Sequence, residues 1–484
     1  MPKYAIKAAS GRFYVYRYLV DKKEVIYMDA KENKMLTGTI WKQILIFFFP
    51  ILIGTFFQQL YNTIDALIVG RYSGKIALSA VGGSSAQIIN FVVGFFTGLT
   101  GGASVLIAQY YGGKDKKKLK DALHTAYGFS IAGGLVLSII CFFMTPSILR
   151  LMNTPQELME ASTIYIRVYF VGLLFVFIYN MGSSVLRAIG DSKRPLYFLI
   201  VCSIVNIILD LVLVIGFDMG VMGVAIATLV AQGVSAYLVT WWLMRENDEV
   251  RLELKQIRIK PDALKAILRI GIPNGIQSSM YCISNMIVQS ALNLFGVDTM
   301  AAWTAYGKVD VLFWMINASF GIAASTFVGQ NFGAGLYHRM RRGARVCLLM
   351  AIGCAVMFSL VFITAGQMLL GIFTEDANVI EIGMVMITTI APAYFLFVFI
   401  EILSGVLRAQ GKTLVCTTIS ILGICVYRIA WVNVLGTDVG LRELVLCYPI
   451  SWLICAAAII AYYLYQQKKL EVKHIQTVHA NRTS

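Results

Sequence analysis

The sequence predicts an all-α integral membrane protein, with twelve transmembrane helices arranged in two lobes of six. Three observations lead to this fold class. Long apolar segments recur along the 484 residues, of which 58% are hydrophobic and 14% are charged, whereas soluble globular proteins usually contain about 25% charged residues. Lys and Arg are concentrated in alternate connections between these segments, and the second half of the chain repeats motifs of the first half.

The apolar segments set the number of spans. A transmembrane helix needs about 20 predominantly apolar residues, so the chain has room for twelve spans with short connections and for no large soluble domain. We expect the spans near residues 43–70, 76–111, 122–145, 157–186, 194–217, 219–244, 263–295, 299–333, 343–369, 378–407, 412–436 and 440–466. The glycines in GLTGGAS and GQNFGAG, near the ends of the second and eighth spans, predict local breaks in those helices.

The distribution of Lys and Arg predicts that both termini are cytoplasmic. The two tails and the connections after even-numbered spans contain 34 Lys and Arg, and the connections on the opposite side contain four. Cytoplasmic connections of membrane proteins carry the excess of positive charge. The chain is therefore expected to cross the cell membrane an even number of times. Orientation explains the net charge of +15 better than nucleic acid binding does.

The N-terminal tail and the cysteines suggest no processing or redox chemistry. Residues 1–42 are polar and basic, without the apolar core and cleavage site of a signal peptide. Met28 and Met35 are alternative start residues, and the segment before Met28 is expected to be an irregular extension. All nine cysteines lie in apolar segments and none forms a CxxC pair. We interpret them as small buried apolar residues, not as disulfides or metal ligands.

Three motifs recur in the same order at a common offset. FPILIGTFFQQLYNTIDALIVG aligns with IPNGIQSSMYCISNMIVQSALN, AQYYGG with GQNFGA, and SSVLRAIGDSK with SGVLRAQGK. The matched residues are Pro50 with Pro273, Asn62 with Asn285, Gln109 with Gln330, and Arg187 with Arg408. Each half then has six spans. Because six is even, both halves start on the same side and should be related by a pseudo-twofold axis along the membrane normal.

The repeat also sets the expected domain organisation. A cytoplasmic tail (1–42) precedes the N-lobe (43–244), and a cytoplasmic linker (245–262) joins it to the C-lobe (263–466). Residues 467–484 form a second cytoplasmic tail.

Ionisable residues inside a membrane are costly, so each needs an explanation. The first span carries a polar stripe with the i, i+3, i+4, i+7 spacing of one helical face, formed by Gln58, Tyr61, Asn62 and Asp65. We expect this face to point into the bundle. Asp65 is roughly 33 Å of helical rise from the cytoplasmic end, in the outer half of the membrane. Pro50 removes a backbone hydrogen bond from the same helix and allows it to bend there.

Asp210 lies at a comparable depth in the fifth span, with Asn206 one turn before it. It is roughly 24 Å of helical rise from the cytoplasmic end. Two carboxylates and an amide together suit a small hard cation or a proton, because such ions prefer oxygen ligands. The alternative is a structural network of hydrogen bonds that locks the N-terminal half.

The second half contains fewer indications of ion binding. Asp310 lies two residues after Lys308, a spacing at which side chains on a helix do not face each other. An interhelical ion pair and a role in substrate binding are both open for Asp310. Glu401 suits either a cationic substrate or an extended conformation that reaches the inner surface. For Arg428 in the eleventh span we favour structural pairing over direct contact with an anion.

No catalytic motif occurs in the sequence, so we do not expect an enzyme. HExxH, Walker A and Ser/His/Asp patterns are absent, and the four histidines lie at span ends or in the C-terminal tail. The many aromatic and Met residues in the spans suit a cavity for varied organic compounds. Packing between helices explains most of them equally well.

Taken together, these motifs resemble the MATE (multidrug and toxic compound extrusion) family. The N-terminal half carries YNTIDALIVG with GRYSG, GLTGGASVLIAQYYG, LRAIGDSKRP and GVMGVAIAT, and the second half carries IPNGIQ and GQNFGAG followed by arginines. The resemblance extends from about residue 36 to residue 465. It implies twelve helices in two six-helix lobes and export coupled to Na⁺ or H⁺ by antiport.

The resemblance to prokaryotic members also implies a cation site in the N-lobe. Their first-helix aspartate corresponds to Asp65, their fifth-helix Asn-x-x-x-Asp pair to Asn206 and Asp210, and their sixth-helix threonine to Thr228. Pro50 matches the proline thought to bend the first helix. One branch of the family has acidic residues in the seventh and tenth helices. The seventh span here has none and the tenth only Glu401, so we place the coupling site in the N-lobe.

The resulting hypothesis is secondary multidrug efflux, with antiport of organic, often cationic, compounds against Na⁺ or H⁺ by alternating access. Gln58, Tyr61, Asn62, Asn285, Asp310 and Glu401 are candidate substrate-binding or supporting residues. We expect no cofactor, no metal other than a coupling Na⁺, no nucleic acid partner, and a monomer in the lipid bilayer. The alternative is a lipid-linked saccharide flippase of the same superfamily. Such a protein needs several cationic side chains in its cavity, but only Arg167, Lys308 and Arg428 lie within spans.

Overall fold

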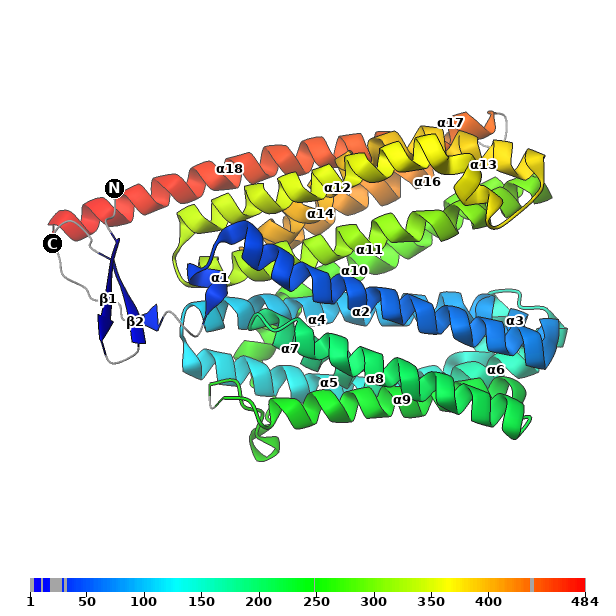
Figure 1. Ribbon diagram of the computed structural model, residues 1–484, viewed down its shortest axis with the longest axis horizontal. Coiled ribbons are helices and arrows are strands. Elements are labelled where there is room, and N and C mark those ends of the chain that lie inside the picture. Colours follow the sequence, from blue (N-terminus) through cyan, green and yellow to red (C-terminus); the bar gives the residue numbers. More distant parts are fainter. Residues whose placement is uncertain are drawn as a thin grey trace.

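The computed structural model describes residues 33–247, 249–435 and 439–472, together with the backbone of residues 4–9, 12–17, 28–29 and 473–483. Almost all of it is helical, and the long helices run alongside one another (Figure 1). The N-lobe consists of α2 (Ile40–Ile68), η1 (Val69–Ser73), α3 (Gly74–Gly82), α4 (Ser84–Gly112), α5 (Lys116–Leu151), α6 (Gln156–Val171), α7 (Leu173–Ala188), α8 (Lys193–Asp210), η2 (Leu211–Gly216) and α9 (Gly220–Leu243).

The C-lobe repeats this pattern. It consists of α10 (Pro261–Asn293), α11 (Val297–Gly333), α12 (Tyr337–Gly371), α13 (Ala377–Ile390), η4 (Ala391–Ala393), α14 (Tyr394–Ala409), α15 (Thr413–Ser420), η5 (Ile421–Val426), α16 (Tyr427–Leu435), α17 (Leu441–Val445) and α18 (Cys447–Thr483). The short helix η3 (Leu254–Gln256) lies in the segment between the lobes. This segment packs against the N-lobe through the buried residues Val250 and Leu252.

The described helices make twelve passes through the bundle, as the sequence predicts. Ten helical segments are long and apolar enough to cross a membrane, and α6 with α7 forms an eleventh pass with a bend of 46°. Helix α10 is the twelfth. It has 33 residues and runs alongside the others, but its sequence is more polar than that of the other spans (Figure 1). Of its polar side chains, Asn274 donates to the Gly98 carbonyl of the N-lobe, while Gln277 and Asn285 accept hydrogen bonds within the C-lobe.

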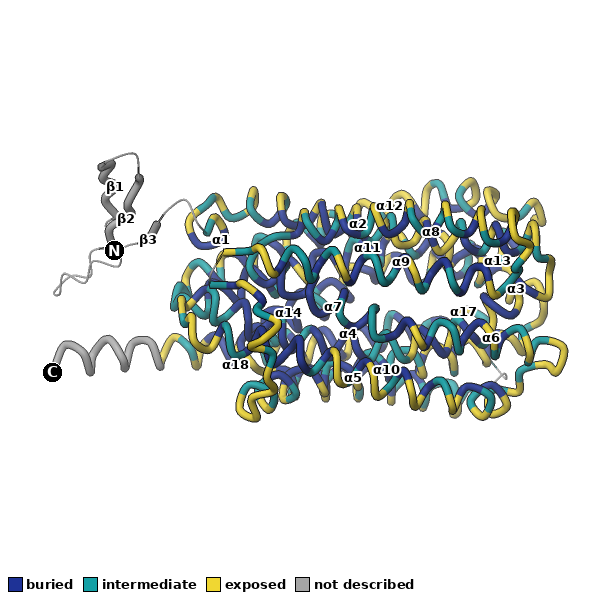
Figure 2. The backbone as a smooth tube through the Cα atoms, turned by 90° about the horizontal axis from the view of Figure 1, so that it is seen from below, coloured by how far each residue is buried: buried dark blue, intermediate teal, exposed yellow. Residues whose placement is uncertain are grey.

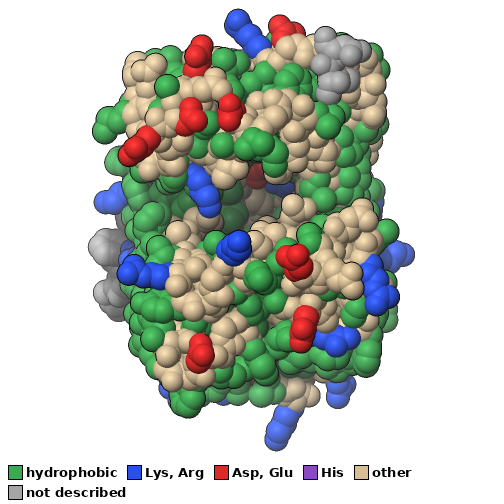
Figure 3. Space-filling model, turned by 90° about the vertical axis from the view of Figure 1, so that its right-hand side faces the viewer, with side chains coloured by type: hydrophobic (Ala, Val, Ile, Leu, Met, Phe, Trp, Pro, Cys, Tyr) green, Lys and Arg blue, Asp and Glu red, His purple; other side chains and the backbone are tan. Residues whose placement is uncertain are grey.

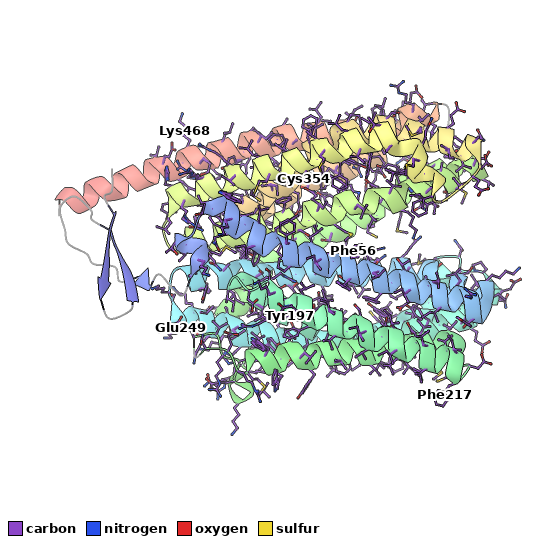
Figure 4. All side chains as sticks on the ribbon, in the orientation of Figure 1. Phe56, Tyr197, Phe217, Glu249, Cys354 and Lys468 are labelled. Carbon is purple, nitrogen blue, oxygen red and sulfur yellow. The ribbon has the colours of Figure 1, made fainter. Side chains whose placement is uncertain are left out.

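The outer surface of the bundle is apolar, while buried residues lie along its inside (Figure 2). On α5, for example, Leu135, Ile139 and Phe143 are exposed at successive turns. An apolar surface of this extent suits contact with lipid rather than with water. Charged connections gather at the end of the bundle that contains the turns after α4, α7, α9, α11 and α14, which we call the basic end. Glu249 lies at the basic end and Phe217 at the opposite, far end (Figure 4).

The two lobes touch closely toward the basic end, where α4 packs against α10. A Cβ atom added at Gly98 would come within 2.6 Å of the Gly275 Cα, and one at Gly102 within 2.6 Å of the Gly271 nitrogen. The helix break predicted at GLTGGAS is wrong, because α4 is continuous there, whereas α11 does end within GQNFGAG, at Gly333. These glycines instead let two helix backbones approach each other without side chains between them.

Two glutamines hold the lobes together in a symmetric way. Gln109 of α4 donates from Nε2 to the Ala409 carbonyl of α14 at 2.7 Å. Gln330 of α11 donates from Nε2 to the Ala188 carbonyl of α7, also at 2.7 Å. Each bond crosses from one lobe to the other, and the four residues are matched pairs of the sequence repeat. We call this pair of hydrogen bonds the glutamine latch.

At the far end the surface is hollowed between the two lobes (Figure 3). The lobes are therefore joined at the basic end and separated at the far end.

The residues before α2 differ in part from expectation. Strands β1 (Tyr4–Ala9), β2 (Arg12–Arg17) and β3 (Met28–Asp29) form a small antiparallel sheet, where an irregular extension was expected. The short helix α1 (Lys34–Thr37) follows. The Met35 carbonyl accepts hydrogen bonds from Asn331 and Arg339, so the chain just before α2 is fixed to the C-lobe.

Candidate functional site

Four polar residues predicted to form a cation site are buried within the N-lobe. Asp65 lies near the end of α2, Asn206 and Asp210 in the last turns of α8, and Thr228 on α9. Their side chains are 7%, 1%, 0% and 5% exposed, respectively. The carboxyl groups of Asp65 and Asp210 are close enough to interact with each other.

The polar atoms of this cluster lack partners. Within the described residues, one Asp65 oxygen, both Asp210 oxygens, both Asn206 side-chain atoms and the Thr228 hydroxyl form no hydrogen bond. Neither acid forms an ion pair with Lys or Arg there. Buried polar groups are normally hydrogen-bonded, so a group of unpartnered oxygens is the donor set of a site that takes a cation or a proton.

The helices change their winding directly beside this cluster. Helix α8 ends at Asp210, and the π-helical turn η2 follows at once. Helix α2 continues into the π-helical turn η1 one turn after Asp65. Short π-helical segments within α-helices are frequent at functional sites. Tyr165 of α6 lies within electrostatic range of both acids. Nothing in the sequence indicates Tyr165, because its helix carries no other polar residue of the cluster.

The predicted polar stripe on α2 is only partly buried. Tyr61 and Asp65 are buried, whereas Gln58 and Asn62 are exposed. The four residues do share a broad face, but only its inner edge packs inside the N-lobe.

Pro50 lies where α2 changes the lobe that it contacts. Before it, Ile44, Phe47 and Phe48 belong to the core of the C-lobe, and the Phe48 ring stacks on Phe320 with a centroid distance of 4.0 Å. After it, Gly54 faces Leu199 of α8 in the N-lobe. Pro273 marks the matching point in α10.

The C-lobe contains a cavity of about 550 Å³. Its lining includes three of the candidate residues, Asn285, Asp310 and Glu401. The other lining residues are mainly aromatic, among them Trp303, Tyr306, Trp314, Tyr448 and Trp452. Gln58, Tyr61 and Asn62 do not line it.

Asp310 and Glu401 have different partners. Asp310 accepts a hydrogen bond from the Tyr394 hydroxyl and another from Trp314 Nε1 at 2.5 Å, but forms no ion pair within the described residues. Glu401 pairs with Arg408 on the same helix, with an N–O distance of 3.3 Å. The ion pair considered for Asp310 is therefore not formed within the described residues, and Glu401 is paired with Arg408 rather than standing as a free negative charge.

Arg428 is held by structural pairing, as predicted, and its hydrogen-bond partners are neutral side chains. Its Nε donates to Ser451 Oγ and its Nη1 to Asn285 Oδ1, both at 3.1 Å. The guanidinium carbon lies 4.0 Å from the centre of the Tyr448 ring. Within the described residues no carboxylate comes within ion-pair distance of Arg428, which is 4% exposed.

Comparisons with known proteins identify the family. The sequence model of the family described as MatE matches residues 50–212 and 273–432, one segment in each lobe. This chain belongs to the MatE family. The resemblance seen in the sequence is thereby confirmed. Members of this family are transporters, so the chain is a membrane transporter and not an enzyme.

Bacterial relatives match over nearly the whole chain. The Bacillus subtilis protein named "Probable multidrug resistance protein YoeA" is 29% identical, over 93% of this chain and 100% of that protein. The "Multidrug export protein MepA" of Staphylococcus saprophyticus is 23% identical, over 92% and 97% of the two chains.

Solved structures show the same fold. A MATE structure described as being in the bent conformation has a TM-score of 0.85 at 21% identity, and covers 92% of this chain and 99% of that chain. An outward-facing multidrug resistance MATE transporter of the MOP superfamily has a TM-score of 0.84 at 22% identity, over 91% and 99%.

Proposed function

We propose that this chain is a multidrug efflux transporter that exchanges a cation, Na⁺ or H⁺, for an organic, often cationic, compound by alternating access. One observation carries the proposal: Asp65 and Asp210 are buried together without partners within the described residues. An uncompensated buried carboxylate is unfavourable. The site therefore favours a bound cation or a proton, whose arrival and departure can be coupled to transport.

The compounds exported are inferred from relatives. Proteins that match this chain over nearly its full length are named multidrug resistance and multidrug export proteins. We infer small organic substrates and export from the cell for this chain as well.

The charge distribution supports a cell-membrane orientation with the basic end in the cytoplasm. The far end, where the lobes are separated, then faces outward. In this orientation the hollow of Figure 3 opens to the outside, and the glutamine latch closes the cytoplasmic side.

Alternating access then follows from the way the lobes are joined. Substrate enters between the lobes from the cytoplasm, and the lobes rock until the far end opens. A cation from outside binds at Asp65, Asn206 and Asp210, with Thr228 beside them. Helix α2 rearranges near Pro50, where its contacts pass from one lobe to the other. The membrane potential supplies about 2.3 kcal/mol per elementary charge per 100 mV.

Asp65→Asn and Asp210→Asn test the proposal. The purified protein is reconstituted in liposomes loaded with a fluorescent organic cation, and a Na⁺ or H⁺ gradient is imposed. Each substitution removes a charge but keeps the side-chain size. Both variants should fold and reach the membrane, yet lose gradient-driven transport.

The matched control is Asp262→Asn, at an exposed position in the first turn of α10. It should transport like the unaltered protein. Gradient-driven transport that survives Asp65→Asn would overturn the assignment of the N-lobe site.

A further inference from the structure

We propose that the C-lobe cavity is a binding site for a zwitterionic aromatic compound, whose anionic group contacts Arg428 and whose protonated amine lies near Asp310. The cavity is the one described above, of about 550 Å³. Cavities of roughly 300–1,000 Å³ are typical for drug-sized ligands. Its opening faces α10, since the lining residues Asn285 and Gln289 are exposed there.

The cavity holds one positive and one negative charge that do not neutralise each other. Arg428 is buried, and the hydrogen bonds that two of its N–H groups make to described residues both go to neutral oxygens. Asp310 is buried too, and its partners are the neutral Tyr394 and Trp314. A buried charge without an opposite charge is unfavourable, which makes each of them a recognition point for a ligand group of opposite sign.

Two further polar atoms point to a ligand. Within the described residues, Trp452 Nε1 and Asn317 Oδ1 are buried without hydrogen-bond partners, and both residues line the cavity. Trp452 also lies beside Arg428, with 5.8 Å between its ring centre and the guanidinium carbon. An indole N–H and a guanidinium together form a donor pair for a carboxylate. The Asn317 oxygen is an acceptor for a ligand N–H group.

The aromatic walls of the cavity favour a ligand that has an aromatic part. Trp303, Tyr306, Tyr448 and Trp314 present ring surfaces in one cavity. Aromatic faces stack with aromatic ligands and attract organic cations. Glu401 adds no net charge, because Arg408 neutralises it. The cavity is therefore neutral overall but strongly dipolar, which matches a zwitterion better than a simple cation.

Binding in this cavity is a statement about the C-lobe alone, whereas the export of the bound compound rests on the function proposed above. The two are separable by experiment. Binding is measured on the purified full chain in detergent without any gradient, through calorimetry and the fluorescence of the cavity tryptophans. Three related probes are used: the dipeptide Phe-Phe (zwitterion), Phe-Phe-amide (cation) and N-acetyl-Phe-Phe (anion).

We expect Phe-Phe to bind at least about tenfold more tightly than either singly charged probe, because each of those leaves one buried charge unpaired. Arg428→Gln should weaken binding of Phe-Phe and N-acetyl-Phe-Phe and leave Phe-Phe-amide unchanged. Asp310→Asn should weaken binding of Phe-Phe and Phe-Phe-amide and leave N-acetyl-Phe-Phe unchanged. Arg428→Lys should keep the preference for an anionic group. Such crossed selectivity does not arise from damage to the fold.

Three results would overturn the proposal: no binding of any probe, equal affinity for all three, or equal loss of all three in both variants. Asp65→Asn separates binding in the C-lobe cavity from gradient-driven transport. It should abolish gradient-driven transport but leave Phe-Phe affinity unchanged. If the dipeptide binds as expected while Asp65→Asn still transports, the C-lobe site stands and the coupling assignment fails.

Discussion

The two lobes share one architecture, but they bury different charged side chains. The N-lobe buries Asp65 and Asp210 close together, without a cationic side chain as partner within the described residues. The C-lobe buries Asp310 and Arg428 in a cavity with aromatic walls, where neutral groups hydrogen-bond both. The first arrangement suits a small cation or a proton, and the second suits a larger dipolar molecule.

Matched positions of the repeat show how this difference arises. Pro50 and Pro273 both lie where a helix passes from one lobe to the other, and Gln109 and Gln330 make equivalent hydrogen bonds. Asn62 and its counterpart Asn285 are both exposed, but only Asn285 accepts a hydrogen bond from an arginine, Arg428, within the described residues. The backbone framework and the contact between lobes are thus conserved within the chain. Side chains at a few interior positions decide the chemistry.

The largest effect is expected at the basic end, where the prediction tests whether both lobes contribute equally to its closure. Gly112 faces the Gln330 carbonyl, and Gly333 faces the Gln109 carbonyl in the same way. An added methyl group would collide with backbone in both cases, so Gly112→Ala and Gly333→Ala should each prevent the basic end from closing. We expect transport in proteoliposomes to fall by about tenfold or more, since overpacking of this kind costs about 1–3 kcal/mol. Hydrogen exchange should rise at the ends of α4 and α11.

Gly307→Ala is the control, because nothing lies within 4 Å of an added Cβ there. It should leave transport and exchange unchanged. If only one of Gly112→Ala and Gly333→Ala impairs transport, the two lobes do not contribute equally to closing the basic end.

The same glycines show which parts of the fold a sequence can predict. The twelve spans were predictable because a membrane span needs a long apolar helix. The repeat was predictable because its motifs can be aligned within the sequence itself. The glycines of GLTGGAS suggest a helix break from the sequence alone, but α4 is continuous there. Their role depends on a partner helix more than 150 residues away, such as Gly275 opposite Gly98.

For the candidate sites, too, some features were predictable from the sequence and others depend on helix packing. Asp65 and Asp210 were predictable because an acid within a span is costly wherever it lies. That they meet each other depends on the packing of α2 against α8. Structural pairing of Arg428 was predictable, but the identity of its partner was not, because the packing of α16 against α10 decides that Asn285 faces it. The aromatic residues of the spans suggest a cavity, but its position in the C-lobe and the part of Trp452 in its lining follow from the same packing.

A moderate effect is expected from the glutamine latch. Gln109→Ala and Gln330→Ala each remove one neutral hydrogen bond between the lobes, worth about 1 kcal/mol. Each should shift the equilibrium between the joined and separated states of the basic end by roughly fivefold toward separation. The shift is measured as the distance distribution between spin labels at Lys193 and Lys412. Equal shifts support two equivalent bonds, and no shift in either variant contradicts the latch.

The smallest effect concerns a difference between the lobes outside the membrane. Asp115 precedes α5, and its carboxylate accepts a hydrogen bond from the Lys118 backbone N–H at 3.1 Å. The backbone and side-chain hydrogen bonds of Lys118 hold the pKa of Asp115 below its usual value. Leu336 occupies the matching position before α12, with similar backbone angles and no capping bond. The N-lobe helix is therefore capped by a titratable side chain and the C-lobe helix is not.

Since the folded state lowers the pKa of Asp115, its stabilising effect is present above its unfolded pKa and is lost as the pH falls through the folded value. Asp115→Leu should lower the melting temperature slightly at neutral pH and have no effect in acid. Leu336→Asp should raise it slightly at neutral pH, because it gives α12 the same cap. Both changes are followed by thermal unfolding of the detergent-solubilised protein between pH 3 and pH 7. A pH-independent change in either variant would mean that packing of the side chain at this position, and not the cap, determines the difference between the lobes.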